Sequence, residues 1–114
     1  MQIRGDQIDA IAQARLESAD RRLVEYGRQR FPAALGPRSN ADLLAFVGRV
    51  RATAAGYGIV REDNVATCLD FSVMYTEEFH RADWAADVLQ CDRLHGPDKM
   101  ALLRHRVEQT GVNL

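Results

Sequence analysis

Lysine is almost absent from this chain: of its fifteen basic side chains only Lys99 is a lysine, and the rest are arginines. Sixteen acidic side chains balance them, which leaves a net charge of −1 and a pI near 6.3. A nucleic-acid-binding domain usually carries a clear excess of basic charge. We therefore expect no nucleic acid partner, although a small helical regulator that binds nucleic acid stays as a second alternative.

Long apolar runs are also lacking. The chain opens on Met1-Gln-Ile-Arg-Gly-Asp with no apolar central stretch of a signal peptide, and no later run approaches the length of a membrane span. The two cysteines, Cys68 and Cys91, are too few for a disulfide framework. These absences favour a cytoplasmic protein without a membrane partner.

Nowhere does the sequence show alternating apolar and polar residues bounded by hairpin turns, so no strand is required. Apolar residues instead recur at spacings of three and four. We predict helices over about 6–30, from about 40 to 55, over 62–75, a short one from 83, and one from 96 that ends at Gly111. The predicted fold class is all-α, a compact bundle of four to five helices in one domain, 1–114.

The first predicted helix carries one apolar stripe, interpreted as facing the core. Its members are Ile8, Ile11, Ala12, Leu16, Ala19, Leu23 and Tyr26. Acidic and basic side chains alternate between them, whereas a helix that lies on a membrane has a mainly basic polar face. The stripe therefore predicts burial inside the protein.

The predicted helix boundaries rest on specific residues. Pro32 pushes the preceding Phe31 out of the helical region, and the stretch 32–40 is expected to be a turn-rich connection. Ser39 or Asn40 is expected to cap the second helix, and Gly56 or Gly58 to stop it. Asp83 is expected to cap the fourth.

The residues that could support chemistry do not assemble into a known pattern. His80 lies near Glu77, Glu78 and Asp83, but the sequence lacks two histidines four apart with a glutamate between them, and His95 and His105 are distant. Cys68 is predicted in the core, and Cys91 has no neighbouring base. We expect no catalytic residue, no metal and no cofactor.

The charge is unevenly distributed along the chain. Residues 1–60 carry nine basic and six acidic side chains, whereas residues 61–90 carry two basic and seven acidic ones. An acidic surface can select a partner by charge complementarity, and an aromatic side chain such as Trp84 can anchor it. The hypothesis is a partner-binding face made of Glu77, Glu78, Phe79, Asp83, Trp84 and Asp87. The alternatives are core packing of the aromatic residues and a chance distribution of charge.

Several junctions between the predicted helices form a pattern that resembles a known family. They are Met1-Gln-Ile-Arg, Arg30-Phe31-Pro32, Ala55-Gly56-Tyr57-Gly58-Ile59, Glu62-Asp63-Asn64-Val65, and Phe79 followed by Asp83-Trp84-Ala85 and Val88-Leu89. The chain resembles a family of small, uncharacterised helical proteins encoded in bacterial type VI secretion gene clusters, beside spike and effector genes. It departs from the pattern at Thr76 to Glu78, where a glycine is expected.

The resemblance implies a non-catalytic accessory of secretion, an adaptor or chaperone that binds an effector or a spike component. An immunity protein that binds and neutralises a cognate toxin is the alternative, because it would also be small and without a catalytic site. Homodimerisation through the first or third predicted helix also stays open.

Overall fold

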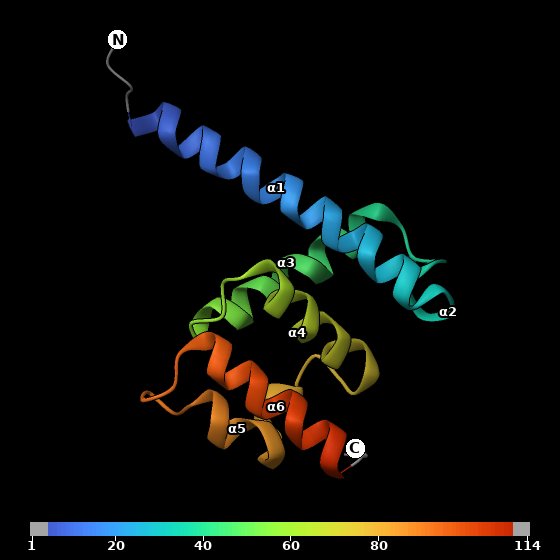
Figure 1. Ribbon diagram of the computed structural model, residues 1–114. Coiled ribbons are helices and arrows are strands. Elements are labelled where there is room, and N and C mark those ends of the chain that lie inside the picture. Colours follow the sequence, from blue (N-terminus) through green and yellow to red (C-terminus); the bar gives the residue numbers. More distant parts are fainter. Residues whose placement is uncertain (1–4, 111–114) are drawn as a thin grey trace. The chain divides into compact units, whose positions relative to one another are not determined.

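The computed structural model describes residues 5–110, with the side chains of 9–109, and over this range it contains helices and no strands (Figure 1). The elements are α1 (Gly5–Arg30), α2 (Pro32–Leu35), α3 (Asn40–Gly56), α4 (Glu62–Met74), the 3₁₀ turn η1 (Phe79–Arg81), α5 (Asp83–Leu89) and α6 (Gly96–Thr110). The all-α prediction is confirmed. The predicted stop at Gly111, the side chain of Ile8 and the opening Met1–Arg4 lie outside the described residues.

The chain divides into two compact units, Met1–Val47 and Gly48–Leu114, with the boundary inside α3. The prediction of a single domain over 1–114 stays a prediction.

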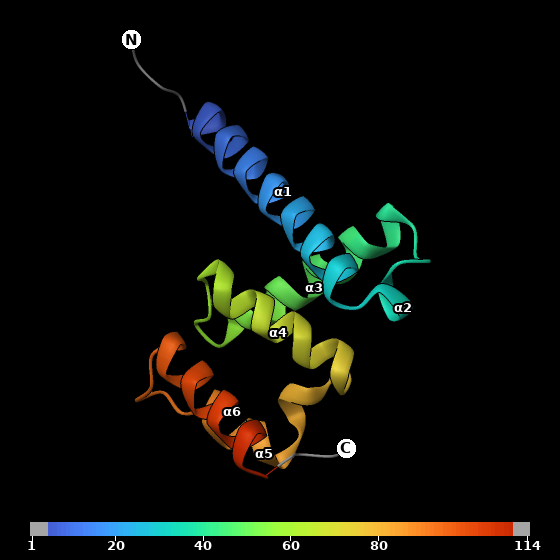
Figure 2. The ribbon, with the colours of Figure 1, turned by 45° about the vertical axis from the view of Figure 1, so that its right-hand side comes forward.

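In the first unit, α2 packs against α1 (Figure 2). Arg28 of α1 donates to the Oδ1 of Asn40 at 2.5 Å and to the carbonyl oxygen of Arg38 at 2.6 Å. Ser39 Oγ accepts from the Asp42 amide at 3.1 Å and so caps α3, as one of the two sequence alternatives predicts. Asn40 instead serves as a partner of Arg28.

Two sequence predictions about the first unit need correction. The connection 32–40 contains the short helix α2, because Pro32 sits at a first helical position, where its missing N–H costs nothing. The stripe on α1 is buried only in its second half, at Ala19, Leu23 and the neighbouring Val24. Ile11, Ala12 and Leu16 are exposed, so their part of the stripe is not buried.

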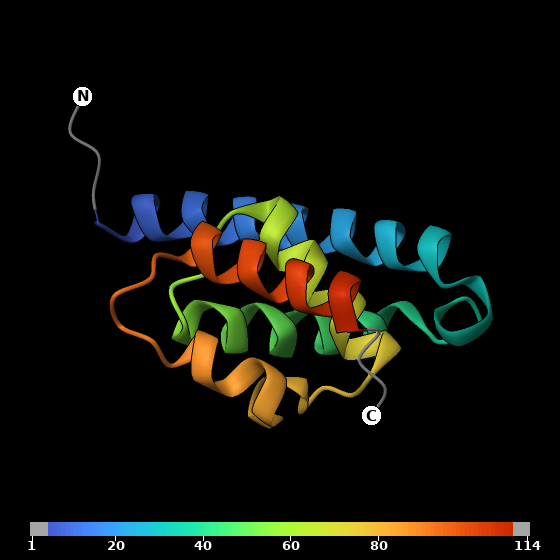
Figure 3. The same cartoon turned by 60° about the horizontal axis from the view of Figure 1, so that its bottom comes forward.

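The second unit holds the larger core. Its almost fully buried side chains come from the loop before α4 and from α4, α5 and α6, and they are Ile59, Val65, Leu69, Ala85, Leu89, Met100 and Leu103. α5 and α6 run antiparallel and are joined by residues 90–95 (Figure 3). The predicted cap by Asp83 is wrong, because Asp83 is the first residue of α5 and the preceding Ala82 offers no side-chain acceptor.

Two glycines allow the loop after α3 to meet the start of α6. Gly58 has φ +78°, a left-handed conformation that favours glycine and ends α3 as predicted. A Cβ on Gly96 would come 2.4 Å from the Gly58 carbonyl oxygen. The absence of a side chain at Gly96 therefore permits the close approach of the two backbones.

Lys99 joins three elements at this point. Its side chain is only 6% exposed, and Nζ donates to the carbonyl oxygens of Tyr57 at 2.9 Å and of Leu89 at 2.7 Å. Tyr57 directly follows α3, and Leu89 ends α5. A cation at the carbonyl end of a helix is favoured by the helix dipole, so one ammonium group stabilises two helix ends from its place on α6.

We expect Lys99→Met to lower the free energy of unfolding by about 3 kcal/mol, because two buried carbonyl groups lose a charged donor. The measurement is urea denaturation followed by circular dichroism. Arg93→Met is the control, since it removes a basic group from a nearby exposed position and should change stability by no more than about 0.5 kcal/mol. Equal stability of the two variants would contradict the role given to Lys99.

Candidate functional site: the Glu77–Asp87 face and the cavity beside it

The six residues of the hypothesised partner-binding face, here called the Glu77–Asp87 face, all lie in the second unit. Glu77 and Glu78 are in the turn after α4, Phe79 opens η1, and Asp83, Trp84 and Asp87 lie on α5. Four of the six, the carboxylates, are exposed. The binding role of this face stays a prediction.

The aromatic residues of the face belong to a cluster with α4. Phe79 is 4% exposed, so its ring packs in the core. Trp84 is half-buried, with its ring centre 6.1 Å from that of Phe79 and 5.7 Å from that of Phe71. Its indole N–H is buried and has no hydrogen-bond partner among residues 9–109. Most of this aromatic surface therefore stabilises the fold, and of the two aromatic residues of the face only Trp84 retains some exposure.

The acidic charge of the face is largely compensated by arginines. Glu77 accepts two hydrogen bonds from Arg49 of α3, at 2.8 and 3.0 Å, and Glu78 pairs with Arg81 at 3.2 Å. Among the described residues Asp83 has no ion pair.

The ion pair of Asp87 comes from α6. Arg106 donates to the two carboxylate oxygens of Asp87 at 2.7 and 2.9 Å and also to the carbonyl oxygen of Trp84 at 2.7 Å. Hydrogen bonds from Arg106 lower the pKa of the Asp87 carboxyl group. Arg49 and Arg106 lie outside the acidic stretch 61–90, so the excess of negative charge along the sequence is not an equal excess on the folded surface.

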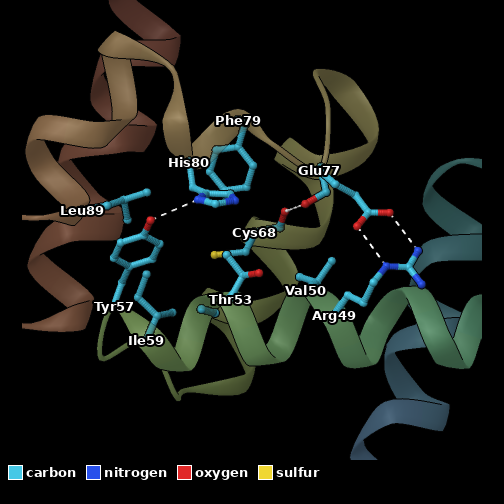
Figure 4. Close-up of a pocket in the computed structure, with 12 residues that line it drawn as sticks. Arg49, Val50, Thr53, Tyr57, Ile59, Cys68, Glu77, Phe79, His80 and Leu89 are labelled. Carbon is cyan, nitrogen blue, oxygen red and sulfur yellow. Dashed lines mark hydrogen bonds and ion pairs between the residues drawn. The ribbon is translucent and has the colours of Figure 1, made fainter.

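A small cavity lies beside this face, between α3, α4 and η1 (Figure 4). At one end Tyr57 Oη lies 3.0 Å from Nδ1 of His80, and at the other end Arg49 pairs with Glu77. Thr53, Cys68 and Leu89 line the space between them. The cavity measures about 20 Å³, enough for the centre of a water molecule and too small for a metabolite.

The titratable groups in this cavity are not arranged for nucleophilic chemistry. Burial raises the pKa of the Cys68 thiol to about 12, and Cys68 Sγ lies 3.8 Å from the sulfur of Met100. Ser72 Oγ donates to the carbonyl oxygen of Cys68 at 2.8 Å. A reactive cysteine needs an electropositive setting that lowers its pKa, so this thiol behaves as an apolar core group.

The surroundings of His80 favour the neutral form of its imidazole ring. Burial lowers its pKa most, the charge of Arg81 lowers it further, and Glu78 acts in the opposite direction. The neutral ring can accept at Nδ1 from the Tyr57 hydroxyl group. Within the described residues no three His, Cys, Asp or Glu side chains gather in a way that could hold a metal ion.

No local pattern in the sequence indicates the ion pairs and hydrogen bonds of this site. Arg49 is 28 residues from Glu77, Tyr57 is 23 from His80, and Arg106 is 19 from Asp87. Helical spacing reports neighbours three or four residues apart, so pairs at this separation depend on the tertiary fold.

A second surface lies on α1, where the sequence predicts burial. Every residue from Asp9 to Glu17 is exposed, including Ile11 at 51% and Leu16 at 41%. Isolated exposed apolar side chains are common, but here they lie close together on one helix. We call residues 9–17 the exposed α1 segment.

Comparisons of the chain with protein-family models, with curated proteins and with solved structures gave no match. Among the described helices none is both long enough and apolar enough to span a membrane. Over its described residues the structure defines the class of the chain as all-α.

The low pKa of His80 makes stability depend on pH. Its pKa in the folded protein is lowered from the ordinary 6.5, so the unfolded chain binds the proton more readily. We expect the contribution of His80 to the free energy of unfolding to be complete well above pH 6.5. This contribution should decrease as the pH drops below 6.5. One proton limits the slope to about 1.4 kcal/mol per pH unit, and solvent screening at this half-buried site makes it smaller.

His80→Asn should flatten this dependence, because the amide oxygen accepts from Tyr57 without titrating. His105→Asn is the matched control at an exposed position of α6 and should keep the slope. Urea denaturation at several pH values measures both variants. A slope that survives in His80→Asn would contradict the assignment to His80.

Proposed function

We propose that this chain is a non-catalytic protein-binding accessory of a bacterial type VI secretion system, an adaptor or chaperone that binds an effector or a spike component in the cytoplasm. The observation that carries the proposal of binding is the exposed α1 segment, which presents Ile11, Ala12 and Leu16 to solvent. A helix that offers apolar side chains at such spacing is a common means of protein recognition.

The cavity beside His80 supports a binding role over a catalytic one. The cavity beside His80 is the size of a water molecule, the Cys68 thiol has a raised pKa, and Ser72 donates to the backbone. An active site needs a pocket in which titratable groups converge on a reacting atom. The groups that line this cavity do not converge in this way.

The link to secretion rests on the helix junctions that carry the resemblance. Arg30-Phe31-Pro32 ends α1 and begins α2, and Ala55 to Ile59 contains the end of α3 with the left-handed Gly58. These segments have structural roles in this chain, since they form the ends of α1 and α3. The type VI assignment is therefore supported by sequence pattern, and the binding role by the exposed helix.

The proposal is tested by locating the gene of this chain and titrating the purified protein with the spike and effector proteins encoded beside it. We expect one of them to bind with micromolar or tighter affinity in isothermal titration calorimetry. Co-expression should leave the toxicity of an effector unchanged. Absence of binding would contradict the proposal, and rescue of cells from a toxin would replace it with the immunity role.

Asp83→Arg in the same titration tests the Glu77–Asp87 face. Asp83 is exposed and has no ion pair among the described residues, so its reversal breaks no ion pair and costs only about 1 kcal/mol at the start of α5. We expect a loss of affinity of about tenfold, as for a charge opposite a complementary partner. Asp92→Arg, also exposed, is the control, and an equal effect of both would exclude a specific role for the face.

A further inference from the structure

The cavity between α3, α4 and η1, here called the α3–η1 cavity, has polar groups in its wall that other side chains do not use. All of the residues that line it belong to the second unit, so its lining is defined within that unit. Its volume of about 20 Å³ exceeds the roughly 10–15 Å³ that one water molecule requires. Because apolar cavities stay dry, the chemistry of the wall decides whether this one is hydrated.

Thr53 of α3 brings a hydroxyl group to the α3–η1 cavity. This hydroxyl group makes no hydrogen bond to any residue from 9 to 109. On α4, by contrast, the hydroxyl groups of Thr67 and Ser72 each donate to the backbone carbonyl oxygen four residues earlier, at 3.1 and 2.8 Å. That is the usual arrangement of such side chains inside a helix. The Thr53 hydroxyl group is therefore left for a partner within the cavity.

His80 of η1 brings a ring nitrogen to the same cavity. Its Nδ1 lies 3.0 Å from Oη of Tyr57, whereas Nε2 has no partner among the described residues. Burial lowers the pKa of His80, which favours the neutral ring. When the Tyr57 hydroxyl group donates to Nδ1, the proton of the neutral ring lies on Nε2, which becomes a donor. Figure 4 shows the side chains of Thr53 and His80 directed toward the space between α3 and η1.

Ser72 of α4 offers a third polar atom in the wall. The proton of its hydroxyl group is used in the hydrogen bond to the carbonyl oxygen of Cys68, so Oγ keeps lone pairs that can accept. The wall thus contains a donor at His80, an acceptor at Ser72 and, at Thr53, a group that can do both. A buried water molecule typically makes about three hydrogen bonds, and it needs this mixture of donors and acceptors.

We propose that the α3–η1 cavity binds one ordered water molecule, held by Nε2 of His80, the hydroxyl group of Thr53 and Oγ of Ser72. The water accepts from Nε2–H, donates to Ser72 Oγ, and shares one further hydrogen bond with Thr53. It joins α3, α4 and η1 through polar contacts where the side chains leave a gap. The inference concerns the interior of the second unit and does not depend on the proposed function.

A water molecule suits this cavity better than an ion or a metabolite. The volume excludes a metabolite, and the described residues bring no three His, Cys, Asp or Glu side chains together for a metal ion. Arg49 and Glu77 pair at one end and compensate each other, so they favour neither a cation nor an anion. A small neutral molecule that both donates and accepts is the ligand that fits this wall.

The test is a high-resolution crystal structure of the full chain, unaltered and as Thr53→Val and Thr53→Ser. Valine keeps the shape of threonine without its hydroxyl group, whereas serine keeps the hydroxyl group. We expect electron density for one water molecule within about 3.2 Å of both Thr53 Oγ1 and His80 Nε2 in the unaltered chain. The density should disappear in Thr53→Val and remain in Thr53→Ser. Its persistence in Thr53→Val, or its absence from the unaltered chain, would overturn the inference.

Two measurements on the unaltered chain keep the test independent of how well a variant folds. The nitrogen chemical shifts of the His80 ring, recorded well above pH 6.5, should show a proton on Nε2 and none on Nδ1. A proton on Nδ1 would contradict the donor assigned to the water. Crystals pressurised with xenon should show no xenon in the α3–η1 cavity, since xenon enters dry apolar cavities. Xenon bound there would overturn the inference.

Discussion

The packing of the helices in the second unit depends on one buried ammonium group. Lys99 of α6 binds the carbonyl oxygens of Tyr57 and Leu89, and so fixes the ends of α3 and α5 against the start of α6. Lysine suits this position because its head group can donate in several directions, and because two helix ends each offer partial negative charge. Tyr57 is in turn hydrogen-bonded through its hydroxyl group to His80 at the edge of the cavity, which links η1 to the same arrangement.

The same unit explains why the acidic middle of the sequence does not give a simple acidic surface. Its carboxylates meet arginines that lie far away in the chain, Arg49 for Glu77 and Arg106 for Asp87. These exposed pairs each contribute little to stability. They also leave Asp83 as the one carboxylate of the Glu77–Asp87 face that has no ion pair with a described residue.

Local signals in the sequence are enough to predict the helices and several of their ends. Pro32 and Pro97 restrict the backbone at the starts of α2 and α6, and Gly58 can take the left-handed conformation that follows the end of α3. Burial cannot be predicted from such local signals. The periodicity of α1 shows that the helix is amphipathic, but it does not show that Ile11 and Leu16 are exposed to solvent. The residues of the candidate face could be named from the sequence, whereas the arginines that pair with them across helices depend on the tertiary fold and could not.

The proposed binding role requires that residues 9–17 form a helix in the free protein. Nuclear magnetic resonance tests this directly, through the Cα chemical shifts and amide exchange rates of the unbound chain. We expect helical shifts throughout 9–17, with amide exchange faster than at 19–27, where α1 is packed. Random-coil shifts over 9–17 would contradict it, because the segment would then have to fold on its partner.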